Sequence, residues 1–369
     1  ARIALEQEKE KNTPVDVIEE GQTVGSMSGA RGVKIGWLVA FTRHYECHNW
    51  TSGDIIRKIV KPATEELRCR MVELREMANF VGDASTFISY AQAGKWGDLI
   101  AAILDGGADP ERCVWIDIFA IRQWPSDKPD LDFASTIEHC SSFMVVCSYQ
   151  KEVQEMDWGK IEAGETSLYK LEMSVKKRIC FARVWCLVEA HKACTMAGMP
   201  FIMKVGHHIL GEDGSLEFKA APRNMLEVLY ESVDVEKAEA TVESDRQRII
   251  DGIVAGVGVD KLNATIRGAI GAATDIENSA MQCAACGDTD AIKLVLADPK
   301  SIFDVSSGGF ESVLKALLDS DIITDIDMKD EDDLCGYTAL MYASCNGHES
   351  CVRVLLAAGA DKEARHNSG

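Results

Sequence analysis

Residues able to do chemistry form a few small groups along the chain. Arg122-Gln123-Trp124 combines a cation, an amide and an indole within three residues. Such a set can stack on a nucleobase or contact a partner domain. It can equally be structural, with Trp124 folded over its own sheet edge and Arg122 paired with a local carboxylate such as Asp117. We take Arg122, Gln123 and Trp124 as candidate binding residues for a substrate or a partner.

Two other groups contain metal-ligand residue types. Cys283 and Cys286 form a CxxC pair, and His44, Cys47 and His48 lie close together in the sequence. A structural zinc site takes four ligands, and neither group has the remaining ligands at a suitable spacing. We therefore expect no metal and no resident cofactor.

Charge and composition exclude several function classes. The 369 residues include 59 acidic and 39 basic side chains, for a net charge of -20. Proteins that bind nucleic acid or anionic lipid through charge need a basic face. We therefore do not expect this acidic chain to bind either of them. No apolar run of about 18 residues is present, so we expect no insertion into a membrane. The missing initial Met suggests a piece of a longer protein.

The thirteen cysteines are odd in number and scattered through the chain. A disulfide scaffold instead concentrates an even number in a short chain. We expect reduced thiols, many of them acting as small core residues, and hence the cytoplasm or another reducing soluble compartment.

Short apolar runs alternate with helical segments in the first half of the chain. Strands are expected at 86–90, 114–119, 143–147 and 201–205, and helices at 96–104, 133–141 and 182–197. This alternation predicts an α/β fold with a parallel sheet covered by helices on both faces. Ligands of such sheets bind at the carboxyl ends of the strands.

The predicted organisation has five parts. These are a flexible arm (1–30), a helical lead-in (31–84), the α/β domain (85–216), a helical connector (217–272) and a repeat array (273–369). Within the α/β domain, a polar insertion at 149–177 has no assigned role. His207 and His208 are expected in a solvated loop after the last strand.

The clearest motif is an ankyrin repeat running from Gly336 to Asp361. Thr338 opens its first helix, Gly347 makes the turn and Gly359 ends the second helix. Equivalent residues occur 60 positions earlier, from Met281 to Leu296, and an irregular middle repeat lies between. Because one repeat cannot bury its own face, we expect stacked repeats in an array that continues past Gly369.

The repeats are strongly acidic. Residues 273–369 contain 18 acidic and 7 basic side chains, and Asp330, Glu331, Asp332 and Asp333 form a run before the last repeat. Ankyrin repeats bind protein partners, and these four residues are candidates for steering a basic partner surface at long range. The alternative is a solvated loop with no binding role.

Four motifs of the α/β region occur in the order and spacing of a known family. They are Phe87-Ile-Ser-Tyr90, Val114-Trp-Ile-Asp117, Phe143-Met-Val-Val146 and Arg183-Val-Trp-Cys-Leu-Val-Glu189. Together they resemble a Toll/interleukin-1 receptor (TIR) domain, in a divergent form similar to proteins of algae and other protists. The resemblance spans about 85–206 and implies a flavodoxin-like sheet.

The resemblance also implies an activity, because some members of the family hydrolyse NAD with a glutamate in this helix. By position that glutamate is Glu189, and Tyr90 and Trp185 become candidate substrate or partner contacts. A carboxylate beside the cleaved bond can stabilise an oxocarbenium-like ribosyl centre or orient water. The alternative is a solvated acid on a helix whose aromatic residue packs inward.

Three functions remain open from the sequence. The one that the sequence favours is a signalling scaffold whose TIR-like domain self-associates or docks while the ankyrin repeats select a protein partner. The second is an NAD hydrolase that uses Glu189, with NAD as substrate. The third is a structural subunit of a large complex. An open cavity around Glu189 would distinguish the enzyme from the other two.

Overall fold

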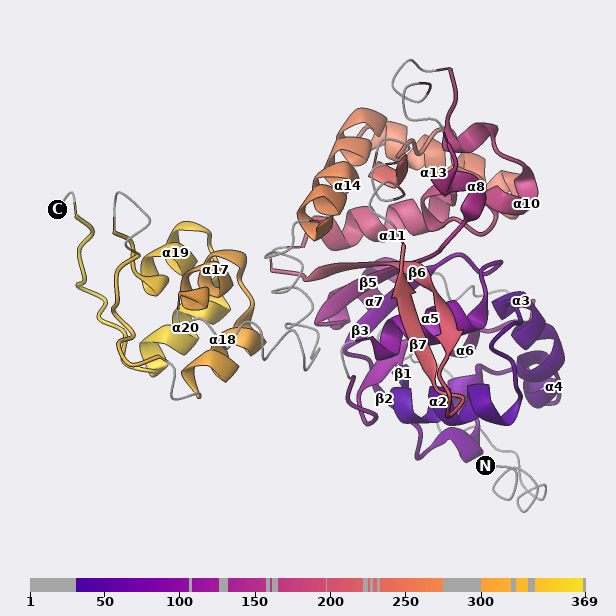
Figure 1. The fold of residues 1–369 in the computed structure, drawn as a ribbon, viewed down its shortest axis with the longest axis horizontal. Coiled ribbons are helices and arrows are strands. Elements are labelled where there is room, and N and C mark those ends of the chain that lie inside the picture. Colours follow the sequence, from indigo (N-terminus) through magenta and orange to yellow (C-terminus); the bar gives the residue numbers. More distant parts are fainter. Residues whose placement is uncertain are drawn as a thin grey trace, which may run out of the picture.

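The computed structural model describes residues 31–105, 108–125, 132–156, 160, 165–196, 198–221, 225, 228–230, 233–274, 300–319, 323–330 and 336–367. The predicted arm at 1–30 and the Cys283–Cys286 pair lie outside these residues. The described chain forms an α/β part followed by a group of ankyrin-like helices (Figure 1).

A seven-stranded mixed sheet runs through the α/β part in the order β2-β1-β4-β3-β5-β6-β7. Its strands are β1 (Arg31–Lys34), β2 (Val81–Asp83), β3 (Thr86–Tyr90), β4 (Cys113–Trp115), β5 (Ser142–Ser148), β6 (Phe201–Leu210) and β7 (Leu216–Ala220). Strands β4, β3, β5 and β6 are parallel to one another. These are the four strands expected from the sequence, although β4 ends at Trp115 and a short helix takes over.

The expectation of a wholly parallel sheet is wrong for the three remaining strands. β1 pairs antiparallel with β2 and β4, and β7 pairs antiparallel with β6. The lead-in at 31–84, expected to be helical, thus supplies two strands. β6 also continues five residues past Val205, which places His207 and His208 in the sheet instead of a loop. Antiparallel pairing needs only a tight turn, such as the one between β6 and β7, and no crossover helix.

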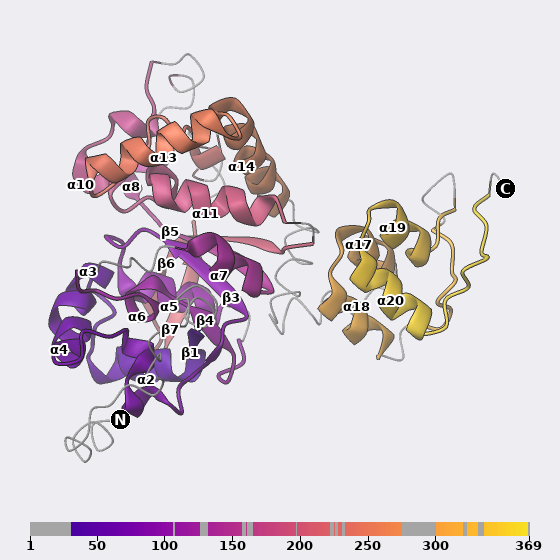
Figure 2. The same ribbon diagram turned by 180° about the vertical axis from the view of Figure 1, so that it is seen from behind.

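Helices cover both faces of the sheet (Figures 1 and 2). The N-terminal segment holds α2 (Ile35–His44), α3 (Ser52–Ile55), the π-helical η1 (Ile56–Val60), α4 (Lys61–Thr64), η2 (Met71–Glu73) and η3 (Arg75–Met77). The sheet connections hold α5 (Trp96–Leu104), α6 (Asp117–Ala120), α7 (Phe133–His139), α8 (Lys151–Gln154), η4 (Leu168–Lys170), α10 (Met173–Lys176), η5 (Cys180–Ala182) and α11 (Val184–Cys194). The predicted connector holds α13 (Glu243–Ala255) and α14 (Val259–Thr274). Helices α2, α5 and α6 pack on one face, and α7, α11 and α14 on the other.

Strand residues alternate between two separate cores, as the pleat requires. On β3, Phe87 faces the core under α11, whereas Ile88 faces the core over α5. The predicted connector contributes Leu262, Ile266 and Ile270 to the α11 core. It therefore packs on the sheet as part of the same body instead of merely linking two domains.

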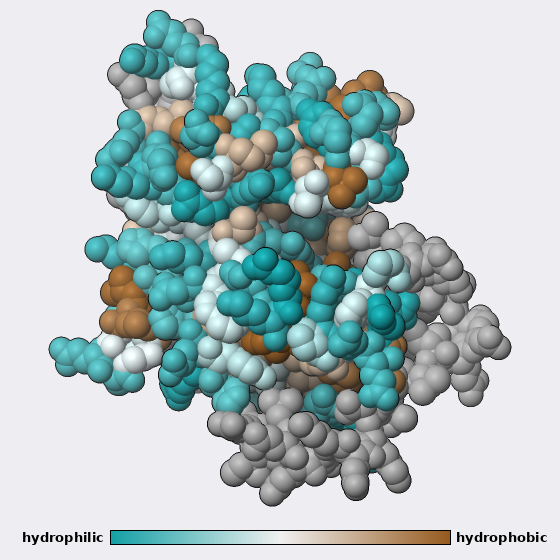
Figure 3. Space-filling view, turned by 90° about the vertical axis from the view of Figure 1, so that its right-hand side faces the viewer, coloured by the Kyte–Doolittle hydropathy of each residue, from teal (hydrophilic) through white to brown (hydrophobic). Residues whose placement is uncertain are grey.

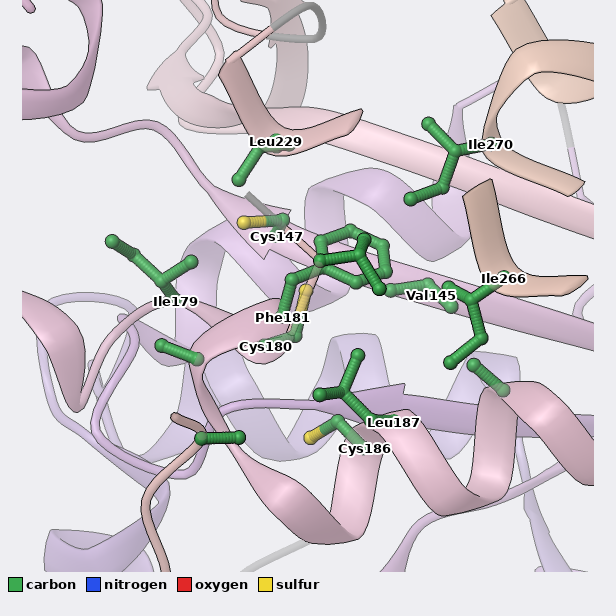
Figure 4. Packing of buried hydrophobic residues seen from close by; sticks show 14 of the residues in the cluster. Val145, Cys147, Ile179, Cys180, Phe181, Cys186, Leu187, Leu229, Ile266 and Ile270 are labelled. Atoms are coloured by element: carbon green, nitrogen blue, oxygen red, sulfur yellow. The ribbon is translucent and has the colours of Figure 1, made fainter. Parts of the chain in front are cut away.

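Three cysteines lie in the core beneath α11. Cys147, Cys180 and Cys186 lie among aliphatic and aromatic side chains such as Val145 and Leu187 (Figure 4). All ten cysteines in the described part of the chain are free thiols, and eight of those ten are buried. They fill space as small apolar residues.

This packing predicts the thiol content of the protein. The chain has thirteen cysteines, and the ten described ones are free thiols. Titration of the denatured, unreduced chain with a thiol reagent should therefore detect close to thirteen thiol equivalents. If the titration finds at least two thiols fewer, and a reductant restores the missing thiols, then disulfides form in the protein.

The C-terminal helices that the structure describes form two stacked helical hairpins. Their bounds are α17 (Ser301–Gly308), α18 (Glu311–Leu318), α19 (Ala339–Cys345) and α20 (Glu349–Ala357). Thr338 caps α19 by accepting a hydrogen bond from Met341 N at 3.4 Å, and Gly359 ends α20 with a φ of 98°. Ala339, Ala343, Cys351 and Leu355 are fully buried between the helices. This core is distinct from the two cores of the sheet.

Candidate functional site

A cavity of about 950 Å³ opens at the carboxyl ends of β3 and β4. The residues that line it come from five regions of the sequence. Thr51, Gly53 and Arg57 come from the N-terminal helical segment, and Tyr90, Gln92 and Asp117 lie at or just past the ends of β3 and β4. The polar insertion contributes Met173 and Lys177. Helix α11 and the residue before it contribute Arg183, Trp185, Cys186 and Glu189. The connector contributes Glu239, Ala240, Thr241 and Asp245. Figure 3 views the side where the molecule is hollowed between its upper helices and its lower half.

Asp117 occupies the strand end of this cavity. It lies two residues past the end of β4, at the start of α6, and its carboxylate accepts hydrogen bonds from the Tyr90 hydroxyl at 2.6 Å and from Gln92 Nε2 at 2.5 Å. Burial raises the pKa of Asp117 although both hydrogen bonds favour the charged form. Burial and the neighbouring Asp117 charge raise the pKa of the Tyr90 hydroxyl well above its usual range. The hydroxyl therefore stays protonated and acts as a donor.

Glu189 faces the same cavity from α11. Trp185 and Glu189 are four residues apart and share one side of the helix, while Leu187 and Ala190 on the other side are fully buried against the sheet. Ser89 of β3 donates its hydroxyl hydrogen to Glu189 Oε2 at 2.7 Å. The half-buried carboxyl is thus fixed by a strand that lies 100 residues earlier in the sequence.

The surroundings of Glu189 favour its neutral form. Burial raises the pKa of this carboxyl to about 8, the Ser89 hydrogen bond opposes the rise, and the charge of Asp117 adds to it. At neutral pH the group is mostly protonated, and it gains its charge near pH 8. A carboxyl that titrates there can give or take a proton under physiological conditions.

The raised pKa predicts a pH-dependent stability that Glu189→Gln removes. Between pH 4.5 and 8 the folded chain holds a proton that the unfolded chain releases, so unfolding becomes easier as the pH rises. From pH 5 to pH 8.5 the wild type should lose about 2–5 kcal/mol relative to Glu189→Gln. Urea titrations at several pH values measure the difference.

Glu212→Gln is a matched control, because Glu212 is exposed in the β6–β7 turn. This variant should follow the pH dependence of the wild type. Parallel stability curves for the wild type and Glu189→Gln would mean that Glu189 ionises in the same range in both the folded and the unfolded chain.

Aromatic and cationic side chains complete the cavity wall. Phe133 packs edge-to-face against Trp115 at 5.8 Å and against Trp185 at 5.5 Å between ring centroids. Arg57, Lys177 and Arg183 provide positive charge at the same cavity. This combination suits a ligand that has both a planar ring and an anionic group.

The structure brings together only some of the residues singled out from the sequence. Tyr90, Trp185 and Glu189 line one cavity. Trp124 instead lies under Arg68, 4.0 Å from its guanidinium carbon, and donates Nε1–H to Thr64 Oγ1 at 3.0 Å. It therefore packs against the α4 region.

The other two loop candidates are also not among the residues that line the cavity. Gln123 donates to the backbone oxygen of Ile121 at 3.3 Å and so stabilises its own loop. Asp117 was named from the sequence as a possible ion-pair partner of Arg122. In the structure its carboxylate accepts hydrogen bonds from Tyr90 and Gln92.

In the repeats, Asp330 accepts a hydrogen bond from the Tyr342 hydroxyl at 2.9 Å. This contact ties Asp330 to helix α19. The candidates Glu331, Asp332 and Asp333 lie outside the described residues.

Sequence reasoning missed Asp117, Ser89, Gln92 and the cations as parts of a site. Asp117 could have been found, because it lies near the end of the strand predicted at 114–119, and ligands bind at the carboxyl ends of such strands. Lys177 and Arg57 carried no such signal, since only the folded insertion and lead-in bring them to the cavity.

No metal centre accompanies these residues. In the described ranges, no group of three or more His, Cys, Asp or Glu side chains is arranged to hold a metal ion. Likewise, no helix among them is long and apolar enough to cross a membrane.

Comparison with known proteins identifies the C-terminal segment. The family model for ankyrin repeats, in three copies, matches residues 280–366. No curated protein and no solved structure matches the chain. The chain therefore carries ankyrin repeats, which support a role in protein–protein interaction.

Proposed function

We propose that the α/β part hydrolyses the N-glycosidic bond of NAD or a closely related pyridine nucleotide. The observation that carries this proposal is the cavity of about 950 Å³ around the Glu189 carboxyl. A protein that served only as a scaffold would have no need for an open cavity at that acid. The volume lies within the range of small-molecule sites, which is roughly 300–1,000 Å³.

The lining residues suit the chemical parts of such a nucleotide. The rings of Phe133 and Trp185 can receive the planar base, and Arg57, Lys177 and Arg183 can face the diphosphate. The resemblance of the Trp185–Glu189 motif to the TIR family supports this assignment. The order of the parallel strands, β4-β3-β5-β6, is also that expected of the flavodoxin-like arrangement.

Glu189 would act in its ionised form during the reaction. Its carboxylate stabilises the positive charge that develops on the ribose as the bond from the anomeric carbon to nitrogen breaks. The bonding electrons leave with nicotinamide, which becomes neutral. The oxygen of water bonds to the anomeric carbon, and its proton passes to Glu189 or to solvent. Asp117, held by Tyr90 and Gln92, adds a second negative charge to the cavity.

The direct test is to incubate the purified chain with NAD and measure released nicotinamide by chromatography. Turnover above that of a Glu189→Gln control supports the proposal. If NAD neither binds nor turns over while the chain binds a protein partner, the scaffold alternative is correct.

The ankyrin repeats favour a second function in the same chain, namely recruitment of a protein partner. We propose that their acidic surface selects a basic partner and that this binding controls where the α/β part acts. Self-association of the α/β part is the other function proposed for a TIR-like domain. It would require a binding surface separate from the repeats.

A further inference from the structure

Among the described residues the sheet ends at β7, and no strand pairs with the outer backbone edge of β7. Among the described strands, β7 pairs with β6 alone. In Figure 1 it lies at the front of the α/β part with no labelled helix drawn before it, and in Figure 2 it lies on the far side. Its five residues include no proline, and its register with β6 is continuous without a bulge. Edges of this kind can pair with another strand.

The hydrogen-bond pattern shows which groups of β7 point outward. Gly211 N–H donates to Ser215 O at 2.9 Å, and Ala221 N–H donates to Val205 O at 2.8 Å. Hydrogen-bonded pairs alternate along an antiparallel ladder, so Glu217 and Lys219 bond to β6 through their backbones. Leu216, Phe218 and Ala220 consequently direct their N–H and C=O groups to the open edge.

The side chains of β7 are complementary to those of an identical strand. In an antiparallel pair centred on Phe218, Glu217 lies opposite Lys219 of the second copy, and Lys219 lies opposite Glu217. Both side chains are exposed on the face away from the α5 core. A pair centred on Glu217 or on Lys219 would instead place like charges opposite each other, which is unfavourable.

We infer that β7 is a dimerisation edge at which two copies of this chain join their sheets in antiparallel fashion about Phe218. The two-fold symmetry makes both halves of the contact identical. It forms two Glu217–Lys219 ion pairs and backbone hydrogen bonds from Leu216, Phe218 and Ala220 of each copy. The inference does not depend on the catalytic role proposed for Glu189.

The test is the mass of the full chain in solution, measured by sedimentation or light scattering from about 1 µM to 1 mM, the range of weak association. The wild type should change from one chain to two. Glu217→Lys and Lys219→Glu should each weaken the dimer at least tenfold, because each creates two contacts between like charges. The double variant Glu217→Lys/Lys219→Glu should restore the dimer.

Glu212→Lys is the matched control, because it makes the same charge change in the exposed turn of the same hairpin. It should leave dimerisation within about twofold of the wild type. A carbodiimide cross-link should also join Glu217 of a ¹⁵N-labelled chain to Lys219 of an unlabelled one. A single-chain mass at all concentrations, or a dimer that neither single reversal weakens, overturns the inference.

Discussion

Replacing Glu189 with glutamine should reduce nicotinamide release from NAD by a factor of about 10²–10³. The amide keeps the shape of the side chain and can still accept the Ser89 hydrogen bond, so the cavity stays intact. It cannot carry the negative charge that the breaking glycosidic bond requires. Chromatography of nicotinamide under saturating NAD measures the effect, and circular dichroism checks the fold.

The pH profile separates a catalytic role from a structural one. If the ionised carboxyl is the active form, kcat/KM should rise with pH and level off above about 8, where Glu189 becomes charged. Ser89→Ala removes a hydrogen bond that lowers this pKa, so its profile should shift to higher pH. Glu212→Gln should retain the wild-type rate and profile. A Glu189→Gln variant as active as the wild type would exclude Glu189 from the reaction.

Replacing Phe143 with alanine should lower the free energy of unfolding of the α/β part by about 3–5 kcal/mol. Phe143 is fully buried, and its ring stacks with Phe87 at 5.5 Å and with Phe201 at 5.6 Å. Phe87 in turn stacks on Trp115 at 4.4 Å. The four rings form a ladder across β4, β3, β5 and β6, because strand register places them directly opposite one another.

Tryptophan fluorescence during urea unfolding measures this effect selectively. All seven tryptophans precede residue 186, so the signal reports the α/β part and not the repeats. Phe143→Leu, which keeps most of the buried volume, should cost clearly less than Phe143→Ala. Leu355→Ala, a buried change in the separate repeat core, should leave the fluorescence transition in place. An unchanged transition in Phe143→Ala would mean that the ladder does not stabilise the sheet.

The sequence alone determined the elements whose signals are local. The ankyrin repeats were recognisable because each repeat uses a fixed set of residues, such as Thr338 at a cap and Gly359 at a helix end. The strands at 86–90 and 143–147 were recognisable because short, mostly apolar runs are typical of strands buried on both faces. The helix that carries Glu189 followed from its apolar residues and its length.

The tertiary structure decided the sheet edges and the walls of the cavity. β1, β2 and β7 are short, partly polar strands, and only their pairing partners make them strands. Arg57, Lys177 and Glu239 lie far apart in the chain, and no local pattern marks them as neighbours. Burial and the charge of Asp117 raise the pKa of Glu189 to about 8, against the opposing effect of the hydrogen bond from Ser89. That environment exists only after residues 100 positions apart have packed together.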